Sequence, residues 1–154
     1  MSNTKRGFTL IELLVVIAII GILSAVVLAS LNTARSKGSD AAVQSDMKTV
    51  QTQAAIYQND NNGSYNTSGV AISASTLAGC TASGVFSDAT IVKALTNVNT
   101  DNAAGGIVCG SDAKGTAYMA AAKLVSSADY FCVDSTGAAT TTATTITAGA
   151  TTCP

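Results

Sequence analysis

The chain begins with a short polar leader and then becomes strongly apolar. Residues 1–7 read MSNTKRG, and between Phe8 and Leu31 the only charged side chain is Glu12. A helix over that segment would be about 36 Å long, which is enough to cross a hydrocarbon core of about 30 Å. The pattern therefore predicts a helix over residues 8–31 that can span a membrane.

Helical periodicity continues beyond Leu31 in an amphipathic form. Apolar side chains recur in steps of three and four residues, with polar residues between them, at Val43, Met47, Val50, Ala54 and Tyr57. This stripe predicts that residues 32–60 continue the helix and lay its apolar face against a small domain. The NDNNG run that starts at Asn59 is typical of a helix end, and Gly38 allows a bend near residues 36–39.

Residues 61–154 are polar and rich in turn-forming residues, which indicates a small globular head. One further helix is expected over Ala89–Val98, capped by Asp88. Short strand-like segments separated by turns predict an antiparallel meander, with strands at Ile107–Cys109, Ala117–Val125 and Tyr130–Val133 and an extended edge in the threonine-rich run that follows. The alanines of 117–122 also suit a helix, and we assign a strand from the context. The predicted fold class is α+β.

The composition narrows the possible functions. The 154 residues are 47% hydrophobic and 11% charged, with a net charge of −1 and no histidine. A general base that titrates near neutral pH and a histidine metal site are therefore excluded, and we expect neither an enzyme nor a cofactor. No lysine or arginine block follows Lys5 and Arg6, so a specific nucleic-acid interface is not indicated.

The charges near the apolar segment predict its orientation. Lys5 and Arg6 precede it, so the positive-inside rule leaves the N-terminus in the cytoplasm and translocates the rest of a single-pass chain. Glu12 is costly there, at about 3 kcal/mol on membrane-insertion scales, and such residues are usually paired. All four cysteines lie in the polar half, which is consistent with an oxidising compartment.

Residues 7–23, GFTLIELLVVIAIIGIL, resemble the processing and assembly signature of the type IV pilin superfamily, which includes pilins, competence pilins and the pseudopilins of type II secretion. The resemblance implies the pilin fold, a long helix packed on a small C-terminal antiparallel sheet. It also implies that a prepilin peptidase removes residues 1–7 by cutting between Gly7 and Phe8, and then methylates Phe8. In a packed bundle Glu12 would pair with the Phe8 amine of a neighbouring subunit. Small residues at helical spacing offer a packing face at Ala18, Gly21, Ala25 and Ala29.

The implied function is structural. The chain would be a subunit of a type IV pilus-like surface filament that serves adhesion, motility or DNA uptake. Its partners would be copies of itself, minor pilins, the prepilin peptidase and the inner-membrane assembly platform with its ATPase. The precursor would lie in the bacterial cytoplasmic membrane and the assembled filament outside the cell. Two alternatives stay open: a type II secretion pseudopilin, and a single-pass anchor that presents a disulfide-bonded binding module.

The cysteines and turn aspartates are the remaining candidates for chemistry. We expect the sequential pairs Cys80–Cys109 and Cys132–Cys153, one of three possible connectivities, because they close short loops. The second pair also resembles the C-terminal disulfide loop of many pilins. Because some pseudopilins bind calcium near their C-terminus, Asp129 and Asp134 are weak calcium candidates, together with Asp112 and Ser135. No EF-hand spacing is present, and solvated turn residues are the preferred interpretation.

Overall fold

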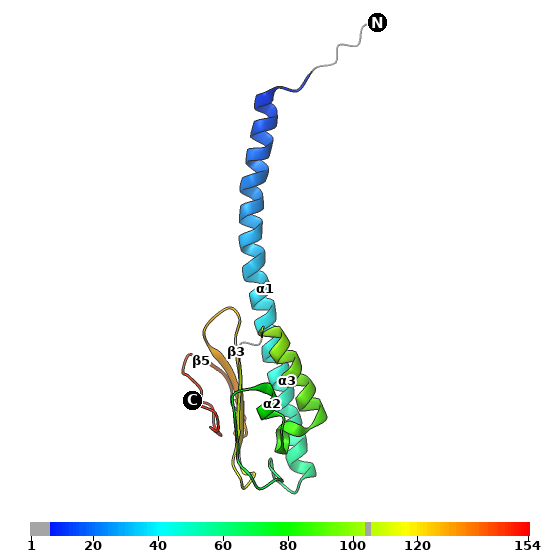
Figure 1. Cartoon of the computed structure of the whole chain (residues 1–154), viewed down its shortest axis with the longest axis vertical. Helices are drawn as coiled ribbons and strands as arrows, with labels where there is room; N and C mark the ends of the chain where they lie inside the picture. The colour runs from blue at the N-terminus through cyan, green and yellow to red at the C-terminus, as the bar shows by residue number, and fades with distance from the viewer. Residues whose placement is uncertain (1–6, 104–105) are drawn as a thin grey trace. The chain divides into compact units, whose positions relative to one another are not determined.

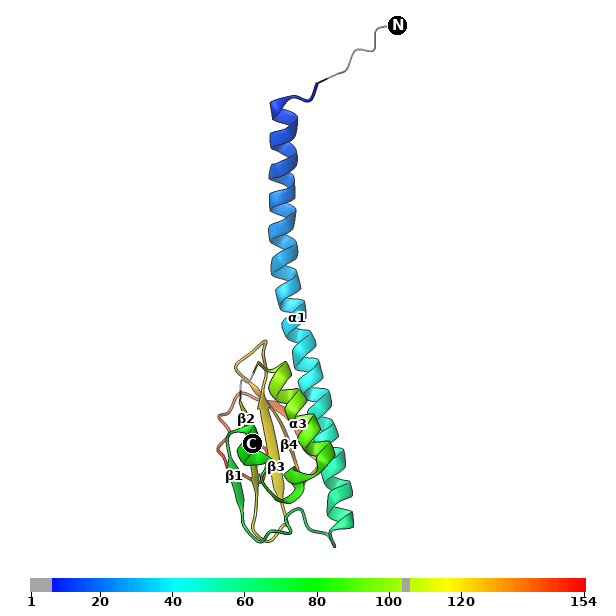
Figure 2. The ribbon, with the colours of Figure 1, turned by 45° about the vertical axis from the view of Figure 1, so that its right-hand side comes forward.

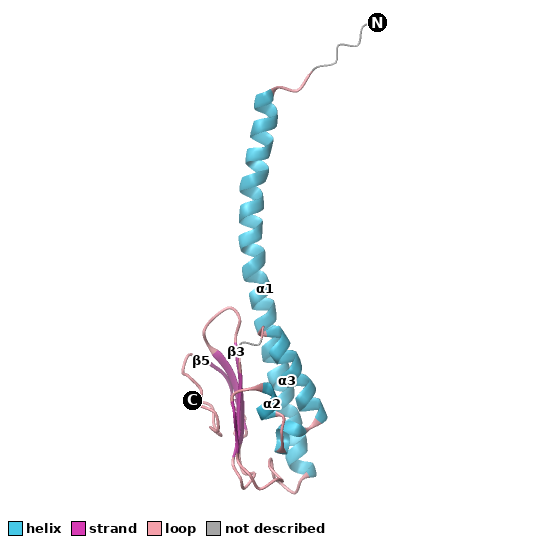
Figure 3. Ribbon diagram, in the orientation of Figure 1, coloured by secondary structure: helices cyan, strands magenta, loops and turns pink. Residues whose placement is uncertain are grey.

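The structure is a computed structural model that describes residues 7–103 and 106–154 (Figures 1 and 3). The helices and strands follow one another as α1 (Leu10–Asp60), β1 (Ile72–Ala74), α2 (Leu77–Cys80), η1 (Gly84–Ser87), α3 (Ala89–Asp101), β2 (Ile107–Ser111), β3 (Tyr118–Lys123), β4 (Tyr130–Asp134) and β5 (Ala139–Thr142). The chain divides into two compact units, residues 1–35 and residues 36–154. The α+β class is confirmed.

Helix α1 contributes to both units and has a different environment in each. In the first unit its large apolar side chains are exposed. In the second unit the predicted stripe is buried at Val43, Met47, Val50 and Ala54, while Tyr57 is partly buried against the same core. The helix runs through Gly38 without a break.

The end of α1 is a Schellman cap. Asn62 adopts the left-handed conformation at φ 55°, and the Gly63 N–H donates to the Gln58 carbonyl at 2.8 Å. This bond satisfies a helix carbonyl that would otherwise lack a partner. The NDNNG run therefore ends the helix in the way that its residue types predict.

The sheet is an antiparallel meander in the order β1-β2-β3-β4-β5 (Figure 2). Strands β2, β3 and β4 lie in the predicted places. Helix α3 begins at Ala89 and is capped by Asp88 as predicted, because the Asp88 carboxylate accepts from the N–H groups of Thr90 and Ile91. Strand β1, helix α2 and the short helix η1 were not predicted. They fall in the connection whose sequence carries no clear period.

Each face of the sheet contributes to a separate apolar cluster. The main core joins the sheet to α1, α2, η1 and α3 and includes Met47, Phe86, Leu95 and Tyr118. The second cluster lies on the opposite face, because alternate residues of the same strands point there; its buried members are Val108, Met119, Ala121, Cys132 and Ile146. Since both faces are covered, β3 is buried almost throughout and its sequence, YMAAAK, shows no apolar and polar alternation.

Asp40 ties α1 to the connection between β3 and β4. Its side chain is only 6% exposed. One carboxylate oxygen accepts from the Val125 N–H at 2.5 Å, and both oxygens accept from Ser126 through its N–H and hydroxyl groups. A buried carboxylate is tolerated when several donors satisfy it in this way.

Asp134, at the end of β4, is a second buried carboxylate that joins separate segments, and it is 2% exposed. Its carboxylate accepts from the N–H and hydroxyl of Thr136, from the Ala138 N–H at 3.2 Å and from the Cys153 N–H at 2.8 Å. Burial raises the pKa of this carboxyl, but the hydrogen bonds, that from Cys153 foremost, outweigh burial and hold the pKa below the ordinary value.

We predict that Asp134→Asn destabilises the head by about 1–3 kcal/mol at neutral pH, because an amide nitrogen replaces one accepting oxygen. A carboxyl whose pKa is depressed on folding contributes stability above its unfolded pKa and loses it as the pH falls through the folded pKa. The gap between Asp134→Asn and the wild type should therefore narrow under acid conditions. Thermal unfolding of the full chain in detergent, followed by tyrosine near-UV circular dichroism, measures the stability of the variant and of the wild type at each pH. A stability difference that is independent of pH would contradict the prediction.

Candidate assembly site at the start of the helix

The first turn of α1 is closed by a reciprocal pair of side chains. Thr9 occupies the N-cap position, and its N–H and hydroxyl donate to Glu12 Oε2 at 2.9 and 2.8 Å. In return, the Glu12 N–H donates to Thr9 Oγ1 at 3.2 Å. This arrangement is a capping box, in which the N-cap and the third helical residue satisfy each other's free backbone donors.

The capping box gives Glu12 a role that the sequence analysis missed. The signal was present, because Thr9-Leu10-Ile11-Glu12 has the T-x-x-E spacing of that motif. A carboxylate in the first turn also interacts favourably with the helix dipole. Part of the cost of placing a carboxylate in an apolar segment is thus offset within the same helix.

Only one oxygen of Glu12 is used by the cap. Among residues 7–103 and 106–154, every hydrogen bond that reaches the Glu12 side chain goes to Oε2. Oε1 therefore remains able to accept from a further donor without opening the cap.

The apolar segment that follows is long and uncovered. Phe8 is 80% and Leu10 86% exposed, and large apolar side chains remain exposed as far as Leu31. Within the described part of the chain, α1 is the one helix long and apolar enough to cross a membrane. The small residues Ala18, Gly21, Ala25 and Ala29 are exposed as well, and a Cβ added at Gly21 would meet nothing within 4 Å. The chain's own packing therefore does not require glycine there.

The segment before the helix holds the expected cleavage position. Gly7 and Phe8 are exposed and lie outside any helix or strand. The remainder of the predicted leader, with Lys5 and Arg6, lies outside the described residues.

In the head, the candidate cysteines form disulfides and the candidate aspartates accept hydrogen bonds from protein groups. The structure contains the disulfides Cys80–Cys109 and Cys132–Cys153. Asp129 accepts from the Ser127 hydroxyl, and Asp134 accepts from four protein donors. Asp112 accepts from Thr116 and Ala117 in its own turn. In the described ranges no three acidic, cysteine or histidine side chains gather into a possible metal site, so the structure offers the calcium hypothesis no ligand cluster.

Comparison with known proteins identifies the N-terminal segment. Residues 2–28 match the family described as the prokaryotic N-terminal methylation motif. The chain is 48% identical over 62 residues to the type IV wide pilus major component PilA4 of Thermus thermophilus, which covers 40% of this chain and 47% of that protein. It is 36% identical over 61 residues to the type II secretion system core protein G of Dickeya chrysanthemi, which covers 40% of each.

The chain thus spans less than half the length of the curated relatives it matches. No solved structure matches it significantly. The resemblance to the type IV pilin superfamily is confirmed, and it supports a pilin-like filament subunit without separating pilins from pseudopilins.

We predict that Thr9→Ala frays the start of α1, because it removes the hydroxyl that both donates to and accepts from Glu12. The loss of an N-cap costs about 1 kcal/mol, which corresponds to a roughly fivefold faster exchange of the Glu12 amide. Hydrogen exchange measured by NMR on the chain in micelles tests this. Thr9→Ser keeps the hydroxyl and should exchange at the wild-type rate; equal protection in Thr9→Ala would show that the cap does not hold the helix start.

Proposed function

We propose that the chain is the precursor of a structural subunit of a type IV pilus-like surface filament. The observation that carries the proposal is the coincidence of the methylation motif over residues 2–28 with an uncovered apolar helix that bears Glu12. The precursor would lie in the bacterial cytoplasmic membrane with its N-terminus inside. Residues 1–7 would be the leader, residues 8–31 the membrane and assembly segment, residues 32–60 the amphipathic half of the helix, and residues 61–154 the head.

Processing would create the partner that Glu12 lacks. Cleavage between Gly7 and Phe8 removes Lys5 and Arg6 and leaves an α-amino group on Phe8, which becomes methylated and stays protonated. When subunits pack side by side, the amine of one can reach Glu12 of its neighbour. Because the capping box uses only Oε2, Oε1 can accept from that amine while the helix start stays capped. Two costly charges then offset each other only when subunits are in register.

Helix packing would provide the rest of the assembly energy. Large apolar side chains exposed from Phe8 to Leu31 can pass from lipid to neighbouring helices with little change in hydrophobic free energy. The small residues Ala18, Gly21, Ala25 and Ala29 would let those helices approach closely. The partners are copies of this chain, minor pilins, the prepilin peptidase and an inner-membrane assembly platform with its ATPase.

The head favours a filament-forming pilin over the pseudopilin alternative. Two disulfides and a five-stranded sheet make a head that is suited to exposure outside the cell. Such a filament would act mechanically, in adhesion, motility or DNA uptake. The similarity to a type II secretion core protein keeps a pseudopilin as the second candidate. Long filaments containing this chain in material sheared from the cell surface would support the pilin proposal, and their absence would favour the pseudopilin.

We predict that Glu12→Gln prevents normal filament assembly although it preserves the cap. Glutamine at this position of a capping box can still bond the helix start, but it carries no charge to pair with the amine. An ion pair worth about 1.4 kcal/mol per subunit contact corresponds to a tenfold loss of assembly, so sheared filament yield should fall by at least that factor. Electron microscopy and immunoblotting of sheared fractions measure it.

Two further variants separate charge pairing from capping. Glu12→Val should be processed and remain in the membrane, yet assemble as poorly as Glu12→Gln. Thr9→Ala weakens the cap and leaves the charge, so it should assemble better than either. Filaments at wild-type yield from Glu12→Gln would overturn the pairing proposal.

The mature N-terminus provides an independent test. We predict that mass spectrometry of the chain from cells with an active prepilin peptidase finds it beginning at Phe8, with one methyl group on the amine. Gly7→Val should block the cut and retain the leader, because a branched side chain replaces the glycine at the cleavage position. A wild-type chain that keeps residues 1–7 in such cells would instead support the single-pass anchor.

A further inference from the structure

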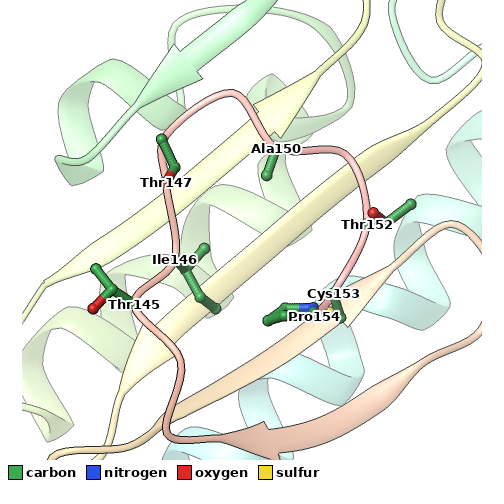
Figure 4. Close-up of a pocket in the computed structure, with 7 residues that line it drawn as sticks. All are labelled: Thr145, Ile146, Thr147, Ala150, Thr152, Cys153 and Pro154. Carbon is green, nitrogen blue, oxygen red and sulfur yellow. The ribbon is translucent and has the colours of Figure 1, made fainter.

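The outer face of the sheet is covered by an irregular segment, residues 145–154, which we call the strap. The strap contains no helix or strand. Figure 4 shows it curving over the strands, with the Ile146 side chain above one of them. An open cavity of about 250 Å³ is lined by strap residues between Thr145 and Pro154. The hollow thus lies within the strap itself, whereas Ala150 of the strap closely approaches Gly110 of β2.

Few noncovalent contacts hold the strap. Ile146 is its only buried apolar side chain in the second cluster, while Ala148, Ala150 and Cys153 are partly buried there. Among the described residues, two hydrogen bonds join strap and sheet: the Gly149 N–H donates to the Cys109 carbonyl at 3.3 Å, and the Cys153 N–H donates to the Asp134 carboxylate at 2.8 Å. The covalent attachment is the Cys132–Cys153 disulfide.

The two disulfides differ in their surroundings. Cys80 and Cys109 are both 0% exposed and belong to the main core, where they join α2 to β2. Cys132 is also buried, but its partner Cys153 is only half-buried and lies in the strap. Attack on a disulfide requires access to one of its sulfurs, and the strap bond is the less buried of the two disulfides.

We propose that the Cys132–Cys153 disulfide is a redox-controlled latch that opens the strap and leaves the main core folded. A thiolate of a low-molecular-weight thiol or dithiol attacks the Cys153 sulfur, the S–S bond breaks, and Cys132 leaves as a thiolate and takes a proton. A second thiolate resolves the mixed disulfide, so the reductant ends as a disulfide and both cysteines end as thiols. A disulfide donor closes the latch by the reverse exchange.

Opening the latch changes the surface of the head. Without the disulfide, Ile146 and two hydrogen bonds must order ten residues of irregular chain, and they compete with its conformational entropy. Release of the strap uncovers the apolar side chains Val108, Met119 and Ala121. A chain with Cys132 and Cys153 reduced would present this apolar face until a disulfide donor acts on it. This inference is independent of the proposed filament role.

The experiment uses the full chain in detergent micelles with both disulfides formed. Increasing concentrations of dithiothreitol are applied, the thiols are trapped with iodoacetamide, and tryptic peptides are analysed by mass spectrometry. Cleavage after Lys93, Lys114 and Lys123 places Cys80, Cys109 and the Cys132–Cys153 pair in three different peptides. Hydrogen exchange on the same samples follows the amides of Gly149 and Cys153.

The latch predicts that Cys132 and Cys153 are alkylated at least about tenfold faster than Cys80 and Cys109. The Gly149 and Cys153 amides should lose protection at the same time, while the amides of α3 and β3 keep theirs. The double variant Cys132→Ala/Cys153→Ala should show the open strap without reductant. Reduction of all four cysteines at one rate would overturn the proposal, and so would a strap that stays protected after Cys132 and Cys153 are alkylated.

A matched pair of glycine variants tests whether strap seating controls access to the latch. A Cβ at Gly110 would collide with the Ala150 carbonyl of the strap, whereas a Cβ at Gly38 would meet nothing within 4 Å. Gly110→Ala should therefore displace the strap and speed reduction of Cys132–Cys153, and Gly38→Ala should reduce at the wild-type rate. A wild-type rate in Gly110→Ala would overturn the assigned role of the strap.

Discussion

The uncovered apolar surface of the first half of α1 is the constraint on which the other features of this protein depend. Between Phe8 and Leu31 the large side chains face outward, and no other described part of the chain covers them. Apolar surface on this scale has to be covered by lipid or by other helices, because each Å² left in water costs about 25 cal/mol. Glu12 interrupts this surface, and the capping box with Thr9 satisfies one of its oxygens before any partner arrives. The segment is thus suited to pass from lipid to contact with other helices.

The head, in contrast, has few large side chains to bury, so other interactions must stabilise it. Its sequence is dominated by alanine, threonine, serine and glycine, so apolar burial per residue is modest. Two disulfides and two buried carboxylates compensate. Asp40 accepts from the distant Val125 and Ser126 N–H groups, and Asp134 accepts from its own turn and from the distant Cys153 N–H. These charge-assisted hydrogen bonds order the segments where apolar contacts are scarce. The proposed latch is consistent with this scarcity of apolar contacts, because the strap has little apolar surface of its own to bury.

Several elements were predictable because their signals are local. A helix satisfies its own backbone, so the stripe from Val43 to Tyr57 and the cap at Asp88 are visible in a short window of sequence. The capping box of Thr9 and Glu12 is an equally local signal, carried by the T-x-x-E spacing. The sequence of β3 is more ambiguous, because its three consecutive alanines favour a helix by propensity. They form a strand because β3 pairs with β2 on one side and with β4 on the other.

The apolar segment, the motif at residues 7–23, the amphipathic half of α1 and the α+β class were predictable from sequence, because each rests on spacing between residues close together in the chain. Tertiary contacts, in contrast, establish what covers each face of the sheet, where β1 pairs and which groups reach the buried carboxylates. The donors of Asp40 lie as far as 86 residues away along the chain, and the Cys153 N–H lies 19 residues from Asp134. Contacts at such separations leave no period in the sequence, so only the folded chain reveals them.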